Sequence, residues 1–231
     1  MANQLDLEEQ EKLDDLKHFW KQYGNLITWA LIAVFGSIAA WNGWQHWQRS
    51  QATQAAVLYD EVERAAQAGD IARLERALTD IRDKFAGTAQ TQQAVLLGAK
   101  VLYEKGKVEA SRDALTWVAG KASDEGYQAV ARLRLAAVLM EGKRYDEALA
   151  QLNEKFPPSF AALVSDRKGD VLAAQGKSAE ARTAYQTAYN TMEPGADYRR
   201  LVEVKLNALG VDAQAAPSTA AASAAGTGGK P

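Results

Sequence analysis

The amino-acid sequence predicts an all-α protein in which a single N-terminal membrane-spanning helix precedes an α-solenoid of helix pairs. Two observations support this. Residues 22–48 contain no Asp, Glu, Lys or Arg, and glycines then recur at a near-constant interval through a body that is poor in proline. These patterns divide the chain into an acidic N-terminal tail (1–24), a transmembrane helix (25–48), a repeat domain (49–210) and a disordered Ala/Ser/Gly/Pro tail (211–231).

The uncharged segment has the length and composition of a membrane span. Leu26 to Trp44 reads LITWALIAVFGSIAAWNGW, with Thr28, Ser37 and Asn42 as its polar members. About 20 apolar residues, each adding about 1.5 Å of helix, cross the hydrocarbon core of a bilayer. A buried core helix is usually shorter and carries a polar face. A cleaved signal peptide would follow a basic segment, whereas this span follows an acidic one. A retained transmembrane helix is therefore expected.

Aromatic residues gather at both ends of this span. Trp41, Trp44 and Trp47 are spaced three residues apart along one helix face, and Trp20 and Tyr23 occupy the matching position at the other end. An indole ring is apolar while its N–H needs a polar partner, which suits the boundary between lipid and water. We expect these five residues to lie at the membrane interfaces. The alternative is an aromatic pocket for a ligand.

The charges near the span leave its orientation open. Lys12, Lys17 and Lys21 precede the span, and Arg49 and Arg64 follow it. Basic residues favour the cytoplasmic side, so this distribution favours a cytoplasmic N-terminus. A difference of one residue is too small to fix the orientation.

The composition of the main body excludes several classes of function. Beyond residue 50 there are 23 acidic and 23 basic residues, so no basic stripe is available for nucleic acid. The sequence has no cysteine, and its two histidines, His18 and His46, flank the span on opposite sides. The Gly-Lys-Ser of AQGKS at 174–178 lacks the first glycine of a phosphate-binding loop and joins two helices. We expect no enzyme activity, no cofactor and no metal ion.

The body after the span shows a repeat of paired helices. Gly69, Gly106, Gly142 and Gly176 each follow a helical run, at separations of 37, 36 and 34 residues. The segments RLRLAAVLMEGKRYDEALAQL and DRKGDVLAAQGKSAEARTAY align with Ala136 over Gly169, Leu139 over Leu172 and Ala148 over Ala181. This pattern resembles the tetratricopeptide repeat, in which small residues let the two helices of a unit approach closely. LLGAKVLYEKGKVEASRDAL fits more loosely, with Ser111 where alanine is expected.

The whole arrangement resembles one family. An acidic segment DLEEQEKLDDLKHFWKQYGN, a tryptophan-flanked span, and repeat helices with VARLRLAAVL and DRKGDVLAAQGK resemble the YfgM family of bacterial ancillary SecYEG translocon subunits over residues 5–210. The resemblance implies a single-pass bacterial inner-membrane protein with a cytoplasmic N-terminus and periplasmic repeats. It also implies association with the SecYEG translocon and with a membrane-anchored periplasmic chaperone of the peptidyl-prolyl isomerase type. Unfolded secreted proteins and the lipid bilayer are the other partners that it implies.

Two hypotheses for function follow. In the first, the protein is a scaffold and chaperone whose concave repeat surface binds a partner or an unfolded chain. In the second, it is a membrane-tethered adaptor for another envelope complex, without chaperone activity. The positions that line the groove of tetratricopeptide repeats correspond here to Leu133, Ala137, Met140, Asp166, Asp170 and Ala173. Asp166 and Asp170 share a helix face, which we expect to be a solvated surface rather than a catalytic pair.

Overall fold

The computed structural model describes residues 7–211, and this part of the chain is helical, with no strand. Most of the predicted disordered tail, from residue 212 onward, lies outside the described residues, so that prediction stays untested. The helices are α1 (Leu7–Ala68), α2 (Ile71–Phe85), α3 (Ala89–Glu104), α4 (Val108–Lys121), α5 (Glu125–Glu141), α6 (Tyr145–Leu152), α7 (Ala161–Ala174), α8 (Ser178–Thr191) and α9 (Asp197–Ala208), with a 3-10 turn at Pro158–Phe160.

The chain divides into two compact units, Met1–Gln54 and Ala55–Pro231. The helix α1 begins in the first unit and ends in the second without a break. The stretch between Gln45 and Ala68 contains no glycine or proline that would interrupt a helix. The first unit is called the anchor segment below, and the second is called the repeat unit.

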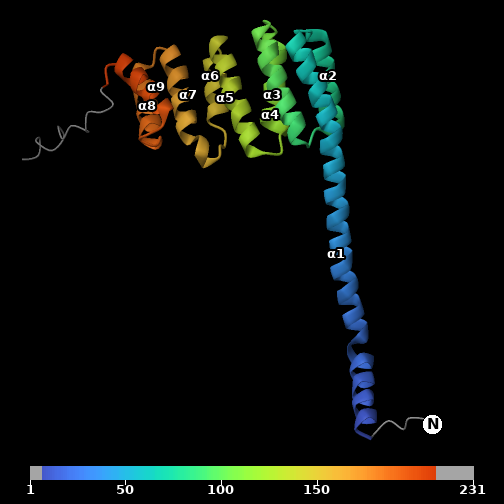
Figure 1. Ribbon diagram of the computed structural model, residues 1–231. Coiled ribbons are helices and arrows are strands. Elements are labelled where there is room, and N and C mark those ends of the chain that lie inside the picture. The colour runs from blue at the N-terminus through green and yellow to red at the C-terminus, as the bar shows by residue number, and fades with distance from the viewer. Residues whose placement is uncertain (1–6, 212–231) are drawn as a thin grey trace, which may run out of the picture. The chain divides into compact units, whose positions relative to one another are not determined.

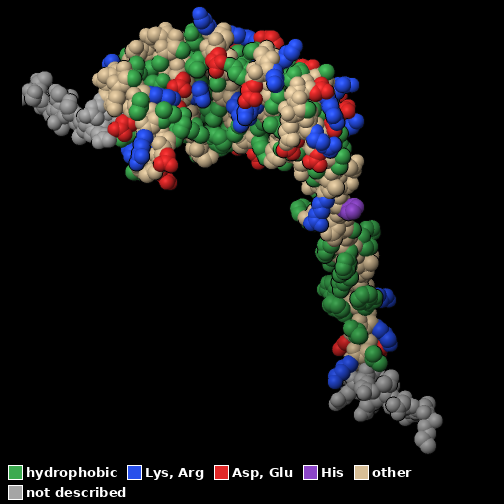
Figure 2. Space-filling view, turned by 45° about the horizontal axis from the view of Figure 1, so that its top comes forward, with side chains coloured by type: hydrophobic (Ala, Val, Ile, Leu, Met, Phe, Trp, Pro, Cys, Tyr) green, Lys and Arg blue, Asp and Glu red, His purple; other side chains and the backbone are tan. Residues whose placement is uncertain are grey.

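The anchor segment contains the one helix in the described part of the chain that is long and apolar enough to cross a membrane. Only 6% of its most apolar window is buried, whereas the core helix of a soluble protein is mostly buried. Hydrophobic side chains gather along the middle of its helix, and charged side chains lie toward both ends (Figure 2). These features fit a membrane-anchored protein.

The repeat unit is a row of helix pairs in chain order (Figure 1). The A helices are the 55–68 segment of α1, α3, α5 and α7, and their B helices are α2, α4, α6 and α8. Most of the buried side chains form one continuous core that extends from Val62 to Val171. A second cluster holds Tyr185 and Tyr189 of α8 together with Val202 and Leu206 of α9.

The small residues of the repeat pattern lie where the paired helices meet. Ala136 of α5 and Ala148 of α6 are both fully buried. In the next pair, a Cβ atom at Gly169 would lie 2.4 Å from the ring of Tyr185, so glycine is required there. Ser111 replaces the expected alanine in the second pair, and its hydroxyl donates to the Ala99 carbonyl at 2.7 Å. The helix pairs predicted from these residues are confirmed.

One backbone turn ends every A helix. Gly69, Gly106 and Gly176 adopt φ values of 67°, 75° and 77°, which L-residues other than glycine rarely adopt. In the third pair, however, the left-handed residue is Lys143 (φ 57°), and Gly142 has φ −75°. In the third pair, therefore, Lys143 and not Gly142 is equivalent to the turn glycines of the other pairs. The backbone bonds confirm the equivalence, because Arg144 N–H donates to Leu139 as Lys177 N–H donates to Leu172.

Replacing Lys143 by glycine should stabilise the protein by about 0.5–1 kcal/mol. A left-handed residue costs about 1–2 kcal/mol, and the greater freedom of glycine in the unfolded chain cancels part of that gain. Urea unfolding of the full chain in detergent, followed by circular dichroism, measures the difference. The matched control is Gly176→Ala, which should destabilise by about 1 kcal/mol because that turn also needs positive φ and has no steric conflict. Equal stability of both variants would contradict this interpretation.

Candidate functional site

The A helices leave a cavity of about 300 Å³ between α3, α4 and α5. This volume is at the lower end of the range for ligand pockets, about 300–1,000 Å³. The residues that line it are Ala99, Lys100, Tyr103, Ser111, Leu115, Arg134, Ala137, Val138 and Glu141. We call this cavity, taken together with the predicted groove residues Leu133, Met140 and Ala173, the A-helix surface.

The lining of the cavity suits binding rather than chemistry. Its interior is aliphatic, from Ala99, Leu115 and Val138. The polar groups at its edge are already paired with protein groups: the Tyr103 hydroxyl donates to Glu141, and Arg134 donates to the Leu96 carbonyl at 3.3 Å. The described residues contain no group of three or more His, Asp or Glu side chains that could hold a metal ion. An apolar side chain of a partner is the group that best matches this lining.

The predicted groove residues of α5 lie on or beside this cavity. Ala137 lines it, and Leu133 and Met140 are half-buried and pack against the main core from the same helix. Ala173 of α7 is half-buried beside the second cluster. Binding by these four residues remains a proposal.

The structure corrects the prediction for Asp166. Its side chain is 2% exposed rather than solvated, and it is enclosed by residues of α9. Lys205 Nζ donates to both carboxylate oxygens, at 2.7 and 2.9 Å, and the Tyr198 hydroxyl donates at 2.7 Å. The expected solvated surface is wrong here, because α9, which follows the last helix pair identified from the glycine spacing, covers it. While α9 is docked, Asp166 cannot contact a partner.

Asp170 belongs to the same cluster. Its side chain is 17% exposed and accepts hydrogen bonds from Lys205 at 2.7 Å and from the Tyr185 hydroxyl at 2.9 Å. Arg167 lies 3.4 Å from its other carboxylate oxygen. We call Asp166, Asp170, Tyr185, Tyr198 and Lys205 the α7–α9 cluster.

Both tyrosines of the cluster act as hydrogen-bond donors. Burial, followed by the charge of Asp170 and the hydrogen bond to it, raises the pKa of Tyr185 above the usual range. Burial and the hydrogen bond to Asp166 raise the pKa of Tyr198 in the same direction. Deprotonation would place a second negative charge beside each carboxylate, so both hydroxyls keep their protons.

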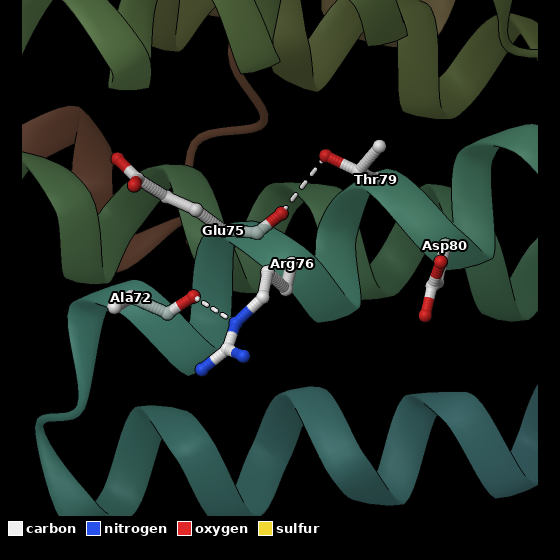
Figure 3. A pocket seen from close by; sticks show the side chains of 5 residues that line it. All are labelled: Ala72, Glu75, Arg76, Thr79 and Asp80. Carbon is white, nitrogen blue, oxygen red and sulfur yellow. Dashed lines mark hydrogen bonds between the residues drawn. The ribbon is translucent and has the colours of Figure 1, made fainter.

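A second hollow, on α2, is open and lies along one exposed helix face (Figure 3). Its lining is Ala72, Glu75, Arg76, Thr79 and Asp80. The interactions there are local: Arg76 Nε donates to the Ala72 carbonyl at 3.1 Å, and the Thr79 hydroxyl donates to the Glu75 carbonyl at 3.0 Å. Contacts of this kind are normal on a solvated helix, so this hollow is no functional site.

The aromatic residues of the anchor segment project outward. Trp20, Tyr23, Trp41, Trp44 and Trp47 are between 43% and 67% exposed. The rings of Trp44 and Trp47 lie against each other, with centroids 5.2 Å apart. An exposed arrangement leaves these side chains free to contact lipid, and their place at the membrane interfaces remains a proposal.

Sequence reasoning missed the cavity and α9. The size of the cavity depends on the separation between α3 and α5, which cannot be predicted from residue spacing. The helix α9 did leave a signal, because Gly210 follows Gly176 by 34 residues and adopts the same turn with φ 77°. Extending the glycine spacing by one step would have found a fifth A helix.

The cavity predicts opposite responses at two adjacent alanines. Ala137→Leu should change the free energy of unfolding by less than about 0.5 kcal/mol, because the new side chain enters open space. Ala136→Leu should destabilise by about 1–3 kcal/mol, because Ala136 is fully buried where α5 meets α6. Urea unfolding of the two full-length variants gives the comparison, and equal losses would show that the cavity is not open to a leucine side chain.

Comparison with known proteins places the chain in a family. A family model described as a tetratricopeptide repeat-like domain matches residues 17–211. The ancillary SecYEG translocon subunit of Neisseria gonorrhoeae is 33% identical over 88% of this chain and 98% of its own length. Proteins of the same name from Haemophilus influenzae and Escherichia coli are 28% and 25% identical, each over 88% of this chain and at least 97% of their own length. The chain belongs to the family of ancillary SecYEG translocon subunits.

Proposed function

We propose that this protein is a non-catalytic, membrane-anchored ancillary subunit of the SecYEG translocon. In this proposal the repeat unit stands in the periplasm as a scaffold and chaperone, and it helps secreted proteins as they emerge. The proposal rests on three features that occur together in one chain. The chain matches the translocon-subunit family, its described part contains one helix apolar enough to cross a membrane, and its repeats carry an open apolar cavity. The anchor would be in the bacterial inner membrane, with the N-terminus in the cytoplasm.

The anchor segment supports the membrane part of the proposal. Its 27 uncharged positions, 22–48, extend about 40 Å as a helix, enough for the hydrocarbon core and part of both interfaces. Trp20 and Tyr23 would lie at the cytoplasmic interface, and Trp41, Trp44 and Trp47 at the periplasmic one. These rings would fix the depth of α1 in the bilayer.

The A-helix surface supports the binding part. The half-buried apolar side chains of Leu133, Ala137 and Met140 adjoin a cavity with an aliphatic interior. An unfolded secreted protein exposes aliphatic and aromatic side chains that such a surface can bury. The same surface could hold a folded partner, for which a membrane-anchored periplasmic peptidyl-prolyl isomerase-type chaperone is our candidate. The second candidate function is an adaptor for another envelope complex, which would use this surface for one folded partner.

Site-specific photo-crosslinking in cells separates these functions. A photoreactive residue at Met140 or Ala173 should label nascent secreted chains and translocon subunits. The control position is Thr116, an exposed residue on the B helix α4. Labelling of one stable folded partner alone would favour the adaptor, and equal labelling from Thr116 would contradict binding at the A-helix surface.

The orientation is tested by protease accessibility. Protease added to intact spheroplasts should digest the repeat unit and leave the first 20 residues protected. Spheroplasts opened with detergent are the control and should lose both parts. Protection of the repeat unit in intact spheroplasts would overturn its periplasmic location and the proposed action on emerging chains.

A further inference from the structure

The helix α9 occupies the place of a fifth A helix. It ends in the same turn as the other A helices, because Gly210 has φ 77° and Val211 N–H donates to the Leu206 carbonyl at 3.1 Å. The same backbone bond joins Lys177 to Leu172 at the end of α7. Counting back from each turn therefore aligns α9 with α7, residue by residue.

This alignment exposes a difference between two contacts of the stack, that of α5 with α7 and that of α7 with α9. The residues twelve and five before the turn of an A helix face the preceding A helix. In α5 they are Ala131 and Val138, and in α7 they are Val164 and Val171; Val138 packs against the main hydrophobic core and the other three belong to it. In α9 the equivalent residues are Tyr198 and Lys205, which bind carboxylates instead.

The A helix that precedes each of these contacts shows the same difference between apolar and polar residues. The residues ten and six before the turn are Leu133 and Ala137 in α5, which contacts α7. In α7 they are Asp166 and Asp170, which receive the α9 side chains. Both sides of the α7–α9 contact are therefore polar at these positions, whereas both sides of the α5–α7 contact are apolar. A buried ionic contact is generally less stable than a well-packed apolar one of similar volume, because the charges lose their hydration.

The other contacts of α9 are few. Two of its side chains, Val202 and Leu206, are buried, compared with five in α5. Both belong to the second cluster with α8, separate from the main core. Arg199 adds a contact over the ring of Tyr189, 3.9 Å from its centroid. These contacts hold α9 in place without joining it to the core that unites the rest of the stack.

We propose that α9 is a releasable cap on the A-helix surface, held by the α7–α9 cluster. When it is docked, Lys205 donates to both carboxylates of α7 and the Tyr198 hydroxyl donates to Asp166. When it is released, Asp166 and Asp170 form an acidic end of the A-helix surface that a lysine- or arginine-bearing segment of a partner can bind. The ionic contact makes this exchange possible, because a basic partner can replace Lys205, whereas an apolar contact would offer no charged group to replace.

Hydrogen exchange of the full chain in detergent, measured by mass spectrometry without any partner, tests the cap directly. In the native protein, amides of α9 should exchange at least about tenfold faster than those of α7. The variant Asp166→Leu/Tyr198→Val/Lys205→Val copies the apolar contact between α5 and α7. It leaves Asp170 bound to Tyr185 and Arg167. It should slow exchange in α9 by about tenfold or more.

Two results would overturn the proposal. One is equal exchange of α9 and α7 in the native protein, and the other is faster exchange of α9 in the triple variant. A second variant, Lys205→Met, covers the case in which the triple variant does not fold. It should speed exchange in α9 at least about tenfold and leave α3, α5 and α7 unchanged. Loss of protection in α7 together with α9 would show that α9 is an integral part of the stack.

Discussion

The close contact between small residues of paired helices is the interaction on which the repeat unit depends. Ala136 of α5 and Ala148 of α6 are fully buried, and a Cβ atom at Gly169 would clash with the ring of Tyr185. A larger residue at either position would separate the two helices of a pair and displace the next pair along the chain. Since each pair buries its apolar face only against neighbours, the spacing of every helix follows from these contacts.

A second constraint acts on the anchor segment. A helix with 27 consecutive uncharged positions would expose a large apolar surface to water, at a cost in free energy. The described structure buries only 6% of its most apolar window. Lipid is the environment that removes this cost. The anchor segment and the repeat unit therefore solve the same problem, the burial of apolar helix surface, with lipid in one case and neighbouring helices in the other.

The helices that have a regular pattern of apolar and small residues were predicted correctly from the sequence. The continuous α1, the helix pairs and the small-residue contacts all follow from spacing, because the apolar periodicity repeats the packing geometry. Lys143 was missed because a non-glycine residue occupies a left-handed turn, which shifted the repeat by one position. Such a turn is visible only when the backbone is known.

The candidate site was predicted less well, for a physical reason. Ala137 and its neighbours on α5 were identified because they recur at equivalent positions of a repeat. Asp166 was misjudged because its environment is set by Lys205, 39 residues later in the sequence. Two polar residues that pair across a long stretch of sequence leave no periodic pattern. The charged contact that would make α9 releasable therefore could not be predicted from residue spacing.

The central claim is that the A-helix surface of a membrane-anchored chain binds translocon components. Hydrogen exchange of the full chain in lipid nanodiscs, with and without co-reconstituted SecYEG, measures this most directly. We predict slower exchange in α3 and α5 around the cavity when SecYEG is present, with the B helices α2 and α6, which do not line the cavity, unchanged. Unchanged exchange throughout the repeat unit, or protection confined to the B helices, would contradict the claim.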